Sequence, residues 1–434
     1  MKITALDALQ IFDSRGHPTI EVIATLEDGT MGRGLVPSGA STGSHEAREL
    51  RDRDPGRFQG RSVFQAIGNV TGEIARVLVG QDSLNQAAID AALIALDGTP
   101  DKSRLGANAV LGVSLAVAKA AAGARKMPLH ASLGGGTLLP LPAVQIFGGG
   151  KHAQGRIDIQ DFMIVALTAN SYAESLEVAS GVFHAAGAEM RSRGKLAGVA
   201  DEGGHWPLFD RNEEVLEVLL ASIERAGYTP GRDVGLSLDI AATDLHRDGH
   251  YRLGLEGRRF SSEDFAALMI GWVERYPIVS IEDPMAEDDW EGWRLVRNAI
   301  GHRCQVIGDD LFTTRLDRIE RGIEAGAANA VLIKLNQIGT VTETLAAIDR
   351  TRAAGWLPVV SARSGETEDA FIAHLAVATD AGQLKVGSFT RGERLAKWNE
   401  VLRIGHELGP RARFVGAGLF ESAGIRFDLA APPH

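Results

Sequence analysis

Charged residues stand at the ends of several short apolar segments of the chain. In a (β/α)₈ barrel, the chemistry lies at the carboxyl ends of the strands, and apolar runs of four to eight residues between turns are typical of buried parallel strands. We therefore expect the charged residues to meet at one end of a barrel. The segments are Val234–Asp239, Ile278–Glu282, Gln305–Asp309, Ala330–Lys334, Leu357–Arg363 and the shorter Gln383–Lys385.

This set of side chains is suited to metal-assisted removal of a proton. Carboxylates such as Asp239, Glu282 and Asp309 supply the oxygen ligands that Mg²⁺ prefers. Lys334 ends an otherwise apolar segment, and desolvation with nearby metal ions would favour its neutral form, which can act as a base. Taken singly, each acid could instead be a helix cap or loop residue, and each lysine, Lys385 included, could reach solvent.

Three further motifs could take part in this chemistry. Glu202, in a DEGG turn after the predicted strand Leu196–Ala200, is a candidate acid or base, although a solvated acidic turn is an alternative. Arg363 and Ser364 lie at a predicted helix start and could bind phosphate, or form an ordinary capping box. His152 lies in a glycine-rich loop, where a histidine is either functional or merely solvated.

The segment Val36–Glu46, which contains Ser41, is rich in glycine and hydroxyl residues. Such a loop could close over an anion or metal, or it could be a flexible surface loop.

The elements that must position these residues form two regions. The first is an α+β domain with an antiparallel sheet, which we place at residues 1–136 because three glycines and two prolines follow its last predicted helix. The second is a TIM-type α/β barrel at residues 137–434, where strands and helices alternate. The expected strands of the first domain are Ile3–Phe12, Thr19–Leu26 and Met31–Val36. The expected helices of both are Ala66–Leu78, Gln86–Leu96, Ala107–Ala122, Tyr172–Arg193, Glu213–Ala226, Ser262–Arg275, Thr340–Ala354 and Glu393–Leu408.

The composition narrows the class of protein. A chain of 434 residues with a net charge of −11 and no basic stripe argues against a nucleic-acid partner. Its single cysteine, Cys304, precludes an internal disulfide and is expected to serve packing, and the cytoplasm is the expected location. No apolar run is expected to reach the ~18 residues of a membrane span.

An ordered series of motifs resembles the enolase family over nearly the whole chain. The motifs are DSRG (Asp13–Gly16), PSGASTG (Pro37–Gly43), LDGT (Leu96–Thr99), GANAVL (Gly106–Leu111), DIQDFMI (Asp158–Ile164), DEGG (Asp201–Gly204), SIEDP (Ser280–Pro284), GDDLF (Gly308–Phe312), IKLNQIG (Ile333–Gly339), SGETED (Ser364–Asp369) and RLAKWN (Arg394–Asn399).

The resemblance implies conversion of 2-phosphoglycerate to phosphoenolpyruvate with two Mg²⁺ ions, in a homodimer or larger homo-oligomer. It assigns Asp239, Glu282 and Asp309 to the tighter metal and Ser41 to the second, with Glu282 and Asp309 also facing substrate. It makes Lys334 the base and Glu202 the acid, assisted by Asp161. Lys385 would hold the substrate carboxylate, Arg363 and Ser364 its phosphate, and His152 would line the site.

Four departures from the family pattern gather near the expected leaving group and phosphate. Ala362 replaces a histidine, Asp161 a glutamate, Gly148 an asparagine and Ala200 a glycine. We expect altered kinetics with 2-phosphoglycerate. Two alternatives stay open: an enzyme with a shifted substrate, such as carboxyphosphonoenolpyruvate synthase of phosphonate biosynthesis, and a non-catalytic binding protein that keeps the fold.

Overall fold

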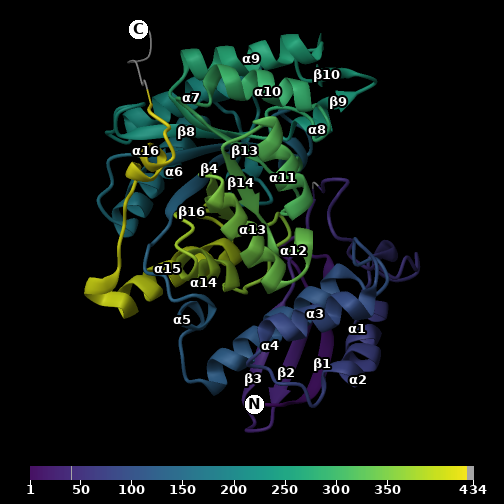
Figure 1. Cartoon of the computed structure of the whole chain (residues 1–434). Helices are drawn as coiled ribbons and strands as arrows, with labels where there is room; N and C mark the ends of the chain where they lie inside the picture. The colour runs from purple at the N-terminus through teal and green to yellow at the C-terminus, as the bar shows by residue number, and fades with distance from the viewer. Residues whose placement is uncertain (41, 428–434) are drawn as a thin grey trace.

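The computed structural model describes residues 1–40 and 42–427, which form a small α+β region followed by a barrel (Figure 1). In the first region, three antiparallel strands pair in the order β1–β2–β3, as the sequence predicts. They are β1 (Ile3–Phe12), β2 (Pro18–Leu26) and β3 (Met31–Leu35). The division proposed at residue 136 lies between the last helix of this region and the first barrel strand.

Helices cover one face of the small sheet, and the longest of them is buried. They are α1 (Phe64–Asn69), the π-helical η2 (Val70–Ile74), α2 (Ala75–Leu78), α3 (Gln86–Asp97), α4 (Ala107–Ala124) and α5 (Leu129–Leu133), preceded by the short η1 (Phe58–Gly60). A Cβ atom added to Gly32 of β3 would lie 2.1 Å from the carbonyl oxygen of Ala116, so this glycine lets β3 contact α4 directly.

Helix α4 is long and apolar enough to cross a membrane by length and composition, which the sequence analysis did not anticipate. In the folded chain, however, 83% of this helix is buried inside the protein. Alanine and valine residues on nearly every face of α4 are therefore explained by packing, as in the core helix of a soluble protein.

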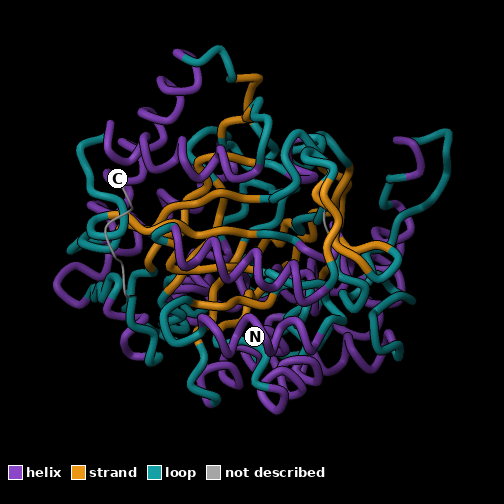
Figure 2. Tube along the Cα trace, turned by 90° about the horizontal axis from the view of Figure 1, so that it is seen from above, coloured by secondary structure: helices purple, strands orange, loops and turns teal. Residues whose placement is uncertain are grey.

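The second region is a closed barrel of eight strands within the described residues, which confirms the predicted fold class. In spatial order they are β4 (Leu141–Gly148), β5 (Asp161–Ala166), β8 (Val234–Asp239), β12 (Ile278–Glu282), β13 (Gln305–Gly308), β14 (Ala330–Ile333), β15 (Leu357–Ser361) and β16 (Gln383–Gly387), which pairs with β4. Figure 2 shows these strands gathered at the centre with helices outside them.

Two features of the sheet were not predicted. β5 runs antiparallel to both of its neighbours, whereas the other adjacent barrel strands are parallel. The strand predicted at Leu196–Ala200 exists as β6 (Leu196–Val199), but it lies outside the barrel. It forms a hairpin with β7 (His205–Pro207), and β7 pairs with β4.

The helices of the barrel pack around its outside; those predicted from the sequence are present within a few residues of their expected bounds, and the other described helices were not predicted. The barrel helices are α6 (Tyr172–Ser192), α7 (Asn212–Arg225), α8 (Ala242–Leu245), α9 (Ser262–Arg275), α10 (Trp290–Ile300), α11 (Leu316–Ala325), α12 (Leu335–Ile338), α13 (Val341–Ala353), α14 (Phe371–Ala378), α15 (Gly392–Leu408) and α16 (Gly418–Ser422). Short η3 (Gly150–Ala153) and η4 (Gly409–Arg411) complete the set, with a small sheet of β9 (His246–Arg247), β10 (His250–Leu253) and β11 (Arg258–Phe260).

The two regions are joined near the carboxyl ends of the strands. Lys119 of α4 forms an ion pair of 2.6 Å with Asp369, just before α14. The backbone of Ser38 pairs with that of Gly365, so the loop after β3 adds an isolated bridge to the segment after β15. The small region is thereby held over the end of the barrel where the charged residues lie.

Candidate active site

Strand register places three carboxylates side by side in the barrel. Asp161 at the start of β5 is directly opposite Asp239 at the end of β8, and Asp239 is opposite Glu282 at the end of β12. Because β5 is antiparallel, its first residue lies at the same end of the barrel as the last residues of its neighbours. All three residues are buried.

The ammonium group of Lys385, in β16, binds this row of acids. Its Nζ lies 2.7 Å from Asp239 Oδ2, 2.9 Å from both carboxylate oxygens of Glu282 and 3.4 Å from Asp161 Oδ2. Burial, reinforced by Asp239, raises the pKa of Glu282 well above its usual range. Burial alone would lower the pKa of Lys385, but Asp239 and Glu282 outweigh it and raise that pKa.

Lys334 and Asp309 form a second buried pair. Lys334 Nζ lies 2.5 Å from Asp309 Oδ2, and the Gln337 amide donates to Asp309 Oδ1 at 2.7 Å. Burial would lower the pKa of Lys334, yet the Asp309 carboxylate outweighs burial and raises it. Without a bound metal ion, the Asp309 carboxylate therefore favours the charged lysine. The neutral form predicted from the sequence depends on nearby metal ions and stays a prediction.

His152 connects Asp161 to the remaining acid, Glu202. Its Nδ1 lies 3.0 Å from Asp161 Oδ1, and its Nε2 lies 3.9 Å from a carboxylate oxygen of Glu202. Burial acts to lower the pKa of His152, but Asp161 and Glu202 together raise it. In turn, His152 and Lys385 overcome burial and lower the pKa of Asp161.

Arg363 and Ser364, two and three residues after β15, are buried beside the loop that follows β3. Arg363 Nη1 lies 2.9 Å from Glu46 Oε2 and 2.8 Å from Asn336 Oδ1. The hydroxyl of Ser364 accepts a hydrogen bond of 2.8 Å from the backbone N–H of Ala40. The predicted anion-binding residues thus contact the glycine-rich loop, whose Ser41 lies outside the described residues.

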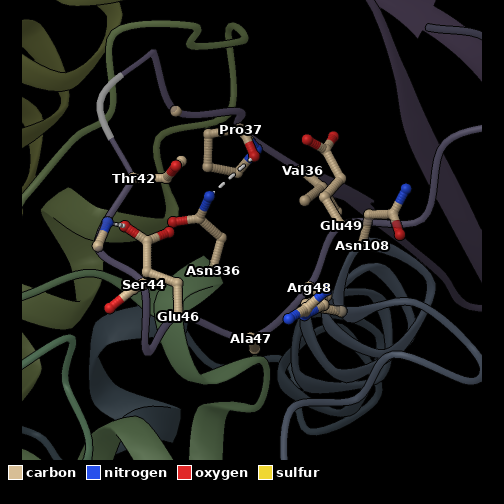
Figure 3. A pocket seen from close by; sticks show the side chains of 13 residues that line it. Val36, Pro37, Thr42, Ser44, Glu46, Ala47, Arg48, Glu49, Asn108 and Asn336 are labelled. Carbon is tan, nitrogen blue, oxygen red and sulfur yellow. Dashed lines mark hydrogen bonds between the residues drawn. The ribbon is translucent and has the colours of Figure 1, made fainter. Parts of the chain in front are cut away.

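Two adjoining cavities are associated with these side chains. The smaller, about 20 Å³, is lined by twelve residues from the barrel end: His152, Gln160, Asp161, Glu202, Asp239, Asp309, Lys334, Ser361, Ala362, Arg363, Ser364 and Lys385. The larger, about 300 Å³, lies under the loop after β3, where Glu46 and Asn336 point into it from different elements (Figure 3). Because Glu46 and Asn336 also contact Arg363, the two spaces share a wall.

The comparisons with known proteins agree with this geometry. The family described as "Enolase, N-terminal domain" matches residues 3–133, and "Enolase, C-terminal TIM barrel domain" matches residues 136–423. The chain is also 53% identical to "Enolase 1" of Desulfitobacterium hafniense (strain Y51), over 98% of this chain and 99% of that protein. The chain belongs to the enolase family. This membership favours an enzyme that dehydrates its substrate over the phosphonate and non-catalytic alternatives.

The donor chemistry of this enolase fits a divalent metal, which the family implies. Asp239, Glu282 and Asp309 offer only oxygen ligands, the preference of Mg²⁺. Among the described residues, the buried Asp161 Oδ2 has no hydrogen-bond partner, although Lys385 Nζ lies 3.4 Å from it as an ion pair. Asp309 also belongs, with Asp283 and Asp310, to a group whose carboxylate oxygens lie within 4.8 Å of one another. Asp283 accepts backbone N–H bonds from both Asp309 and Asp310 at 2.8 Å, and so fixes the direction of that segment.

The four departures from the family pattern lie close to these groups. Ala362 is buried and lines the smaller cavity. A Cβ atom added to Gly148 would lie only 2.5 Å from the Cβ of Ala200, so glycine at one position and alanine at the other fit each other. Asp161 is the central partner of His152.

Sequence reasoning missed several residues that hold the site together. Glu46 ends the predicted loop but was given no role, and Gln337 and Asn336 lie in the IKLNQIG motif without an assigned contact. Gln145 is a fully buried polar residue in β4, where its neighbours Val144 and Ile146 are apolar. A buried amide within an apolar strand was the available signal for Gln145, because such a group needs hydrogen-bond partners.

Proposed function

We propose that this chain is a Mg²⁺-dependent lyase that dehydrates 2-phospho-D-glycerate to phosphoenolpyruvate. The observation that carries the proposal is the lining of the smaller cavity, where the candidate base Lys334 and the candidate acid Glu202 meet Arg363, Ser364 and Lys385. The identity of 53% to a protein named "Enolase 1" supports the same reaction.

In the proposed reaction, the neutral Lys334 amine removes the proton from the carbon next to the substrate carboxylate. The carboxyl group of Glu202 protonates the leaving hydroxyl, so that water departs and the carbon–carbon double bond forms. His152, held by Asp161 at 3.0 Å, lies 3.9 Å from Glu202 and orients this acid. Lys385 binds the substrate carboxylate, while Arg363 and Ser364 bind its phosphate.

We propose that Asp239, Glu282 and Asp309 hold the tighter of two Mg²⁺ ions, with Ser41 near the second and Glu282 and Asp309 also facing substrate. A bound metal would neutralise part of the carboxylate charge that keeps Lys334 protonated. It would also stabilise the negative charge that develops on the substrate carboxylate. A lysine or histidine base combined with one or two Mg²⁺ ions is the established pattern of the enolase superfamily, and the roles proposed here for Lys334 and the three acids follow that pattern.

The partners and location follow from the same proposal. The substrate is a small phosphorylated acid, and the assembly is a homodimer or higher homo-oligomer in the cytoplasm. A net charge of −11 supports a role without a nucleic-acid partner, and no membrane partner is proposed.

The direct test is an ultraviolet assay that follows the absorbance of the enol product from 2-phosphoglycerate and Mg²⁺. We expect turnover by the natural chain and a loss of at least about 10²-fold in kcat for Lys334→Ala, since a general base contributes this much or more. Lys151→Ala is the matched control, because Lys151 lies beside His152 but is 46% exposed and pairs with Asp244. Equal activity in Lys334→Ala, or no turnover by the natural chain, would overturn the proposal.

A further inference from the structure

Gln145 contacts the two segments whose carboxylates flank His152, namely the strand of Asp161 and the turn of Glu202. Its Nε2 donates to Asp161 Oδ1 at 2.5 Å, and its Oε1 accepts the backbone N–H of Gly204 at 2.8 Å. Gly204 closes the turn in which Glu202 lies, since its carbonyl oxygen accepts the N–H of Ala200. One amide therefore links the strand that carries Asp161 to the turn that carries Glu202.

The surroundings of Gln145 are shaped to its side chain. A Cβ atom added to Gly204 would lie 2.5 Å from Gln145 Oε1, and one added to Gly148 would lie 3.3 Å from its Nε2. The amide therefore occupies a space that exists because positions 148 and 204 have no side chain. Gln145 itself is fully buried. A hydrogen bond to a carboxylate in such a dry site is among the stronger kinds.

The length of Gln145 is matched to the short side chain of Asp161. Asp161 has one methylene fewer than the glutamate of the family pattern, so its carboxylate lies closer to its own backbone. Asp161 Oδ1 is nevertheless shared by Gln145 and His152 Nδ1. A longer acid at position 161 would reach further toward the Gln145 amide, to which Asp161 Oδ1 is already hydrogen-bonded.

We propose that Gln145 is a positioning residue for the acid side of the site, and that its length and that of Asp161 form a matched pair. Gln145 is not among the residues that line the smaller cavity. It acts by fixing the Asp161 carboxylate against His152 and by fixing the turn that presents Glu202. This inference rests on the proposed function for its kinetic consequences, but the matching itself is a property of the folded chain.

The experiment is a double-mutant cycle with Gln145→Asn and Asp161→Glu, which moves one methylene from one side chain to the other. We expect each single variant to lower kcat by about 10- to 100-fold with a smaller change in KM, since a hydrogen bond to a charged group has about this worth. We expect the double variant to recover kcat to within about threefold of the natural chain, because the total reach is restored. The pH profile of kcat should shift in the single variants and return in the double variant.

Gln305→Asn is the matched control. Gln305 is a fully buried glutamine at the start of β13, and within the described residues neither of its amide atoms has a hydrogen-bond partner. Shortening it should leave the pH profile unchanged. If the losses of the two single variants at 145 and 161 simply multiply in the double variant, or if either single variant retains natural kinetics, the matched pair does not exist.

A second readout separates this inference from the proposed function. The same cycle is measured in the free energy of unfolding by urea, which needs no turnover. Recovery of stability in the double variant supports the matched pair even if 2-phosphoglycerate is not a substrate. If 2-phosphoglycerate is not a substrate, additive losses of stability in the double variant would by themselves overturn the matched pair.

Discussion

Replacing Lys385 by methionine tests whether one ammonium group compensates the row of acids in the barrel. The side chain of Lys385 is 7% exposed and contacts Asp239 and Glu282 at 2.7 and 2.9 Å. Methionine keeps a similar length and removes the charge. The buried carboxylates would then face one another without their cation.

The size of the effect follows from these distances. At a separation of about 2.8 Å and an effective dielectric constant of about 20, each attraction amounts to roughly 6 kcal/mol before desolvation is counted. Desolvation of the buried ions offsets much of this, and removal of one partner from a buried pair typically costs about 3–5 kcal/mol. We expect Lys385→Met to lower the free energy of unfolding by about that amount in the presence of a chelator.

The pH of the measurement matters. Loss of the ammonium raises the pKa of Glu282 further, so the folded variant binds a proton that the unfolded chain releases. Stability of the variant therefore falls as pH rises above the unfolded value near 4.3. The difference in unfolding free energy between the natural chain and Lys385→Met is expected to be larger at pH 8 than at pH 6.

The assay is urea unfolding with chelator and with saturating Mg²⁺. Because the variant's acids lack their cation, Mg²⁺ should raise its unfolding free energy by more than it raises that of the natural chain. Lys397→Met is the matched control: Lys397 is also fully buried and pairs with Glu366 at 2.9 Å, away from the row of acids. Lys397→Met should be less stable than the natural chain, but Mg²⁺ should raise its unfolding free energy only by as much as it raises that of the natural chain. Equal Mg²⁺ increments for both variants would refute the reasoning.

Two further predictions concern other parts of the chain. Burial lowers the pKa of His374 to about 4, despite Glu400 at 3.2 Å, so the unfolded chain binds a proton below pH 6.5 that the folded chain does not. His374 should cost about 2 kcal/mol of unfolding free energy between pH 6.5 and 5, and His374→Gln should show a smaller loss in urea titrations over that range. Ala362→His should change kcat or KM for 2-phosphoglycerate by about tenfold, as expected for a new hydrogen bond to a charged group; unchanged steady-state values would show that the replacement is kinetically silent.

The strand-end pattern predicted the barrel well because a buried strand and a charge after it are both local features. Asp239 and Glu282 end their strands as expected, and Asp309 and Lys334 follow theirs directly. The antiparallel direction of β5 had no local signal, because strand direction is decided by which neighbours pair.

The contacts between distant residues were the part that the sequence could not predict. Lys334 and Asp309 are 25 positions apart, and the short contact that raises the lysine's pKa depends on the relative height of two strands. The Glu46–Arg363 pair joins residues 317 positions apart and exists only because the loop after β3 lies over the barrel. Motif resemblance assigned roles to residues but gave no such distances.

The contact between positions 148 and 200 restricts the order in which this chain and its relatives could have diverged. With Ala200 present, any side chain at position 148 begins 2.5 Å from that methyl group, so Gly148 cannot be replaced first without a clash. Loss of the methyl group by Ala200→Gly removes only one carbon and is the milder step. An ancestor with glycine at both positions can gain a side chain at either one. The residue gained first at one position then limits what the other position can accept.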